Sequence, residues 1–137
     1  MVDWLIVGAV SGLGPAKIQQ LLTHMEVDDL RQRLEHEKEA LPLSKHLLQS
    51  LAIDYQKVDI ALEWQQQSAD HHLLCFSDPL YPPLLKQLTD PPTVLFLKGC
   101  IEALALPSLA IVGSRNASPG GLQVAYQLAA EMSSIGF

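Results

Sequence analysis

Residues 109–121 combine an apolar run with small polar residues in a pattern that can bind an anion. The apolar run Leu109–Val112 leads into the sequence Gly-Ser-Arg-Asn-Ala-Ser-Pro-Gly-Gly, after which a helix is expected to begin. The N–H groups at the start of a helix, together with the positive end of its dipole, attract negative charge. A guanidinium adds a planar fork that fits phosphate oxygens. The pattern predicts a phosphate site made of Gly113, Ser114, Arg115, Asn116 and Ser118.

The same loop permits a second interpretation, a tight strand-to-helix turn with a solvated arginine. It is not a dinucleotide fingerprint, because Ser114, Arg115 and Asn116 follow Gly113 directly. It is not a Walker A loop, because no Gly-Lys-Ser or Gly-Lys-Thr follows.

A glycine hairpin at Gly12-Leu13-Gly14, with Lys17 close behind, is a second candidate for phosphate binding. The alternative is a compact turn between two helices that needs glycine for its positive φ angles. We favour the turn, because residues 1–70 hold six Lys/Arg against eleven Asp/Glu. Phosphate binding normally requires clustered positive charge.

Other residues with chemical potential are isolated. His71 and His72 have no third ligand at metal spacing, and Cys75 lies in an apolar run as a small hydrophobic residue would. No carboxylate pair and no Ser/His/Asp set follows from the spacing. We therefore expect no metal, no cofactor and no catalytic residue.

The first half of the chain is predicted to be a small helical domain, residues 1–70. An almost entirely apolar segment at residues 4–10 indicates a buried helix. Four positions then suit the beginnings of further short helices, because proline is tolerated in the first turn and Asp or Ser can cap it. These positions are Pro15, Asp28 with Asp29, Ser44, and Asp54.

The second half, residues 71–137, is predicted to be the first part of a Rossmann-like α/β domain. Three apolar runs bounded by Gly and Pro, at 73–76, 93–97 and 109–112, are typical of strands buried in a parallel sheet. The Pro-rich stretch 79–92 has apolar residues between its prolines and is expected to pack. A helix to Ser134 should be followed by another strand, so we expect the chain to be a fragment of a longer protein.

The composition limits the class of protein. The formal charge is −6, and no basic patch appears in the linear sequence. No apolar run approaches the length of a membrane span, and the first residues lack the basic segment of a signal peptide. Two cysteines do not make a disulfide framework, so we expect a cytoplasmic protein.

Two segments resemble the DprA/Smf family of DNA-processing proteins of natural transformation. These are Tyr81–Gly99, with its Tyr-Pro-Pro and Asp-Pro-Pro elements, and Ala110–Ser118. The helical half is similar to the variable domain ahead of that family's core, of SAM or helix-hairpin-helix type. The resemblance implies an α+β chain in two parts, a helical domain and a truncated Rossmann-like domain.

The resemblance also implies a function, that of a non-enzymatic accessory protein. Such a protein binds and protects incoming single-stranded DNA and helps to load a RecA-type recombinase. A homodimer through parts of the core not present here is also implied. The matching DNA-site positions are Gly113, Ser114, Arg115, Ser118 and Gly121.

The chain also departs from the family pattern. The family usually has an aromatic residue where Gly120 stands, and its later glycine-rich segments are absent. We therefore expect this chain alone to bind DNA weakly or not at all. Two alternatives remain: a nucleoside monophosphate hydrolase that holds phosphate at this loop, and a protein-interaction module formed by the helical half.

Overall fold

The computed structural model describes all of residues 1–137 and divides into two compact units, 1–101 and 102–137. The protein is a mixed α/β chain with seven helices and two small antiparallel sheets. None of its helices has the length and apolar character needed to cross a membrane.

The first unit begins with helices, as predicted. α1 (Val2–Gly8) buries Trp4 through Val7, which confirms the buried apolar helix. α2 (Pro15–Leu22) begins with its proline, and α3 (Val27–His36) and a 3-10 turn, η1 (Lys38–Ala40), follow. α4 (Lys45–Ser50) and α5 (Tyr55–Gln66) complete the helices before residue 70.

The predicted caps are confirmed at two of three helix starts. The Ser44 side chain accepts a hydrogen bond from Leu47 N, and the Asp54 side chain accepts one from Lys57 N. The third expectation is wrong: α3 has Glu26 at its N-cap, so Asp28 and Asp29 lie within its first turn. Their charges still favour the helix dipole there.

A small sheet that the sequence does not predict connects the helical segments. β1 (Val10–Ser11) pairs antiparallel with β2 (Ala52–Ile53). Beneath it lies an apolar core built mainly from α1, α2 and α3, including the fully buried Val7, Ile18 and Leu30.

The second sheet corrects the prediction of a parallel arrangement. β3 (His71–Cys75) and β4 (Val94–Lys98) pair antiparallel, with Leu73 opposite Phe96. A parallel pair needs a crossover that covers one face of the sheet, usually a full helix. The connection here contains only the four-residue α6 (Pro83–Lys86), so the chain returns antiparallel.

The Pro-rich connection packs in part. Tyr81 is fully buried and its hydroxyl donates to the Pro92 carbonyl at 2.8 Å. Leu80, Leu84 and Leu88, expected to pack, are exposed. The single aromatic residue therefore anchors this loop.

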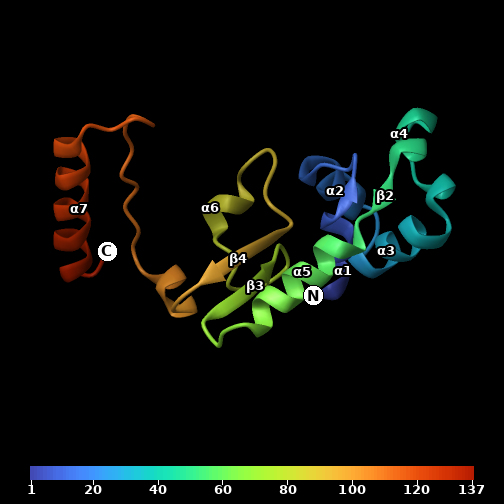
Figure 1. Cartoon of the computed structure of the whole chain (residues 1–137). Helices are drawn as coiled ribbons and strands as arrows, with labels where there is room; N and C mark the ends of the chain where they lie inside the picture. The colour runs from blue at the N-terminus through green and yellow to red at the C-terminus, as the bar shows by residue number, and fades with distance from the viewer. The chain divides into compact units, whose positions relative to one another are not determined.

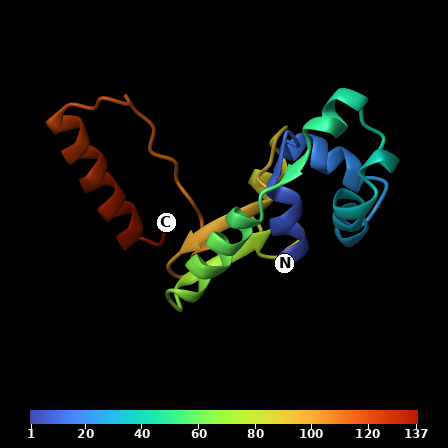
Figure 2. The same ribbon diagram turned by 45° about the vertical axis from the view of Figure 1, so that its right-hand side comes forward.

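The antiparallel hairpin packs on the helices before it. α5 lies along β3, and α1 contacts β4, as Figures 1 and 2 show from two directions. Leu5, Val58, Ala61 and Leu73 share the core between them. Residues 71–101 therefore fold with the helical half in this structure, and the predicted domain division at residue 70 stays a prediction.

η2 (Ile101–Ala105) spans the boundary between the two units, and α7 (Pro119–Ser134) lies in the second. Residues 109–112, predicted to be a buried strand, form no strand and are exposed. A strand satisfies its N–H and C=O groups on a neighbouring strand, and this unit has no other strand. The Rossmann-like arrangement stays a prediction.

Candidate functional site

The predicted phosphate loop lies in the second unit, immediately before α7. All six predicted residues are exposed. Ser118 is the N-cap of α7, and its Oγ accepts a hydrogen bond from Gly121 N at 3.2 Å. The structure thus brings Ser118 and Gly121 together at the helix start, where the dipole is positive.

The preceding turn joins Ser114 and Asn116. The Asn116 backbone N–H donates to Ser114 Oγ at 3.2 Å, and Arg115 lies at the turn between them. Gly113 has no left-handed φ, and a Cβ built there meets nothing within 4 Å. Neither the backbone nor packing within the chain requires this glycine, which leaves space in front of it for a ligand.

Arg115 is the cation that this site offers. Its side chain makes no ion pair and no hydrogen bond with any residue of the described chain, 1–137. An internal ion pair would have removed the guanidinium from the site, and none forms. Two amides, of Asn116 and Gly121, are already occupied by serine hydroxyls, whereas Gly120 N–H has no acceptor within the helix.

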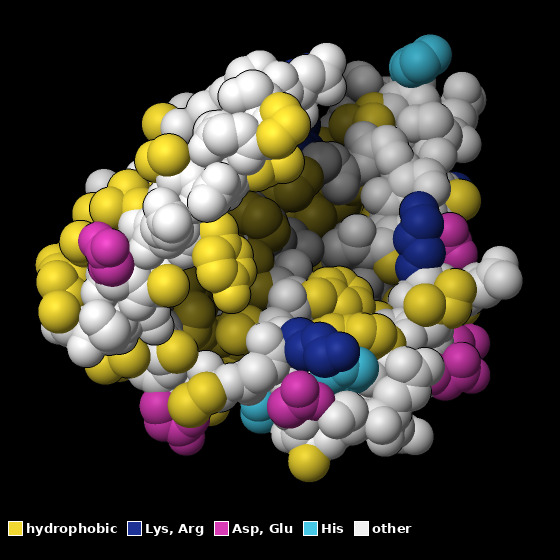
Figure 3. All heavy atoms as spheres, turned by 60° about the vertical axis from the view of Figure 1, so that its left-hand side comes forward, with side chains coloured by type: hydrophobic (Ala, Val, Ile, Leu, Met, Phe, Trp, Pro, Cys, Tyr) yellow, Lys and Arg dark blue, Asp and Glu magenta, His cyan; other side chains and the backbone are white.

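Apolar side chains before the loop and along α7 are exposed. Val112 is 89% exposed, and on α7 Val124 and Leu128 are also exposed. Figure 3, in which the side of α7 comes forward, shows hydrophobic side chains at the surface with few charges among them. The apolar residues Val124 and Leu128 of α7 are thus uncovered within its unit.

The second predicted candidate, the glycine hairpin before α2, is occupied by the chain itself. Gly12 has φ +81°, as the turn interpretation requires, whereas Gly14 at the N-cap has φ −71°. The Ala16 backbone N–H donates to Asp90 Oδ1 at 2.7 Å. A carboxylate of the chain therefore fills the position that a phosphate would take, and Lys17 binds Gln20 instead.

The isolated histidines and cysteines do not form a site. No group of three His, Cys, Asp or Glu residues within 1–137 could hold a metal ion. The His71 ring stacks on Trp64 with centroids 4.2 Å apart, and its Nδ1 lies 2.7 Å from the Trp64 carbonyl oxygen. Cys75 is buried, and this burial raises the pKa of its thiol.

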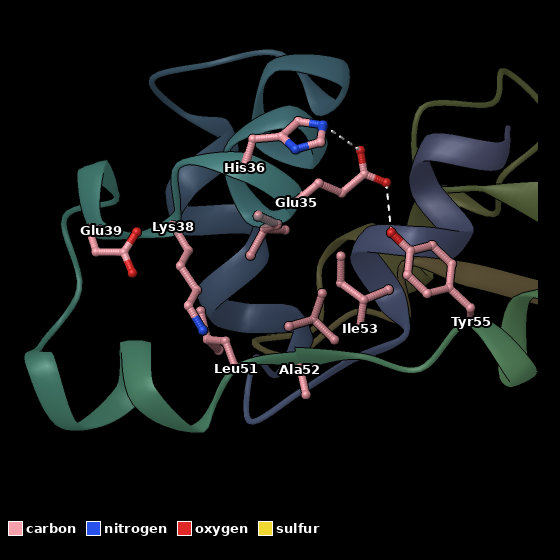
Figure 4. A pocket seen from close by; sticks show the side chains of 10 residues that line it. Glu35, His36, Lys38, Glu39, Leu51, Ala52, Ile53 and Tyr55 are labelled. Carbon is pink, nitrogen blue, oxygen red and sulfur yellow. Dashed lines mark hydrogen bonds and ion pairs between the residues drawn. The ribbon is translucent and has the colours of Figure 1, made fainter.

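Sequence reasoning missed a connected polar network beside a cavity of about 380 Å³. Tyr55 Oη donates to Glu35 Oε1 at 2.9 Å, and Arg31 binds both Glu35 and Asp3. Figure 4 shows Tyr55 and His36 pointing toward Glu35 from either side. Asp3 and Tyr55 lie far from Glu35 in the sequence, so their contacts could not be predicted. Only the spacing of Arg31 and Glu35, four residues apart on one helix, gave a local signal.

Comparison with known proteins gives a family match for about half of the chain. Residues 72–137 match the model of the family described as DNA recombination-mediator protein A. The chain is also similar to Protein Smf of Escherichia coli (strain K12), with 38% identity over 65 residues. That match covers 47% of this chain and 17% of the relative, so the chain spans a small part of the relative's length. No solved structure matches. The resemblance predicted from the sequence is confirmed.

Proposed function

We propose, from the premise that residues 72–137 belong to the DprA/Smf family, that this chain takes part in DNA recombination during DNA uptake. Its role is that of an accessory protein that binds and protects single-stranded DNA and helps to load a RecA-type recombinase. The loop Gly113–Gly121 binds one phosphate of the strand.

The observation that carries this proposal is the exposed, unpaired Arg115 guanidinium ahead of the α7 N-terminus. It belongs to the same loop as the hydroxyls of Ser114 and Ser118 and the Gly120 N–H, which has no acceptor within the helix. These groups are donors to an anion, and residues 113–121 contain no carboxylate that would repel one.

The test is the salt dependence of single-strand binding by the Arg115→Ala variant. Affinity of the full-length protein for a labelled oligo(dT) is measured by fluorescence anisotropy at several salt concentrations. We expect weaker binding and a slope of log K against log salt reduced by about 0.7, the value for one phosphate on a single strand.

The control is Lys45→Ala, which removes one positive charge at an exposed position of α4. It should leave affinity and slope close to those of the unmodified protein. Equal effects of the two substitutions would mean that net charge, and not the loop, determines binding. Capture of a RecA-type recombinase by the protein on single-stranded DNA tests the second part of the role.

A further inference from the structure

We draw no further inference here: the strongest candidate, the free edge of β4 together with the apolar groove that Ile60 of α5 and Phe96 of β4 line beside it, carries none, because nothing in the structure shows what covers it.

Discussion

The carboxylate of Asp90 accepts a hydrogen bond from the Ala16 backbone N–H at 2.7 Å, across 74 residues of sequence. Ala16 is the second residue of α2, so its N–H is one of those that no helical carbonyl can accept. The bond fixes the Pro-rich connection between β3 and β4 to the helical part of the first unit. The DprA/Smf-like segment is thus tied to the helices through Asp90 as well as through its sheet.

Replacing Asp90 should destabilise the first unit. Asp90→Ala removes both the hydrogen bond and the charge at the positive end of the helix dipole, at a cost of about 1 kcal/mol. Asp90→Asn keeps an oxygen acceptor and should cost less. The free energy of unfolding in urea measures the effect, with Glu63→Gln on α5 as a control that loses an exposed charge without a bond. No difference between Asp90→Ala and the control would show that the bond contributes nothing.

Gly8, in α1, is a position where alanine should be unfavourable despite its better helix propensity. A Cβ built at Gly8 comes within 2.5 Å of Thr93 Oγ1, and Thr93 is buried. Alanine normally stabilises a helix interior by about 1 kcal/mol relative to glycine. Overpacking costs typically about 1–3 kcal/mol, so Gly8→Ala should lower the free energy of unfolding.

A double-mutant cycle separates the two effects at Gly8. In a Thr93→Ala background the hydroxyl is gone, and Gly8→Ala should become neutral or stabilising. Urea unfolding of the four proteins gives the coupling energy. Additive effects would indicate that contact with the Thr93 side chain is not what disfavours alanine at Gly8.

Local signals predicted the helices because their evidence lies within a few residues. Ser44 and Asp54 cap helices as predicted, and Pro15 begins one. The buried α1 followed from its apolar character on all sides. At the start of α3 the local rule failed, since two consecutive aspartates gave a strong but misplaced signal.

Strand pairing could not be predicted, because it depends on segments far apart in the sequence. β1 and β2 have two residues each, too few for a periodic pattern. The runs 73–76 and 93–97 were correctly placed near β3 and β4, but their antiparallel pairing joins segments that are well separated in the sequence. The candidate phosphate loop Gly113–Gly121 was predicted from residue types alone and stays a prediction, whereas the Glu35–Tyr55 network needed the fold.

The two cysteines should differ in reactivity. Cys75 is buried in β3 with a raised thiol pKa, so little thiolate is present at pH 8, whereas Cys100 is exposed. We expect a disulfide reagent to modify Cys100 quickly and Cys75 only as the first unit unfolds. Mass spectrometry of the intact chain follows the two additions. Cys100→Ser should remove the fast phase, and a remaining fast phase would contradict the burial of Cys75.

The hydrogen bond from Tyr55 to Glu35 should contribute to the free energy of unfolding at neutral pH, and this contribution should be lost at alkaline pH. This bond is the main reason that the pKa of the Tyr55 phenol is raised above its usual value of 10.0. A folded-state pKa above the unfolded one means that the stabilisation is complete below about pH 10 and is lost as the pH rises through the folded value. Tyr55→Phe should therefore lower the free energy of unfolding by at most about 1 kcal/mol at pH 8, since the pair is exposed.

The difference between the unmodified chain and Tyr55→Phe is the quantity to follow. Burial also raises the pKa of Tyr81, so both proteins lose stability at high pH, and only the difference isolates Tyr55. Urea unfolding at pH 8 and in steps above pH 10 should show this difference shrinking toward zero. Tyr126→Phe, at an exposed position of α7, provides the matched control. A difference for Tyr55→Phe that stays constant across this pH range would show that the phenol proton does not link α5 to α3.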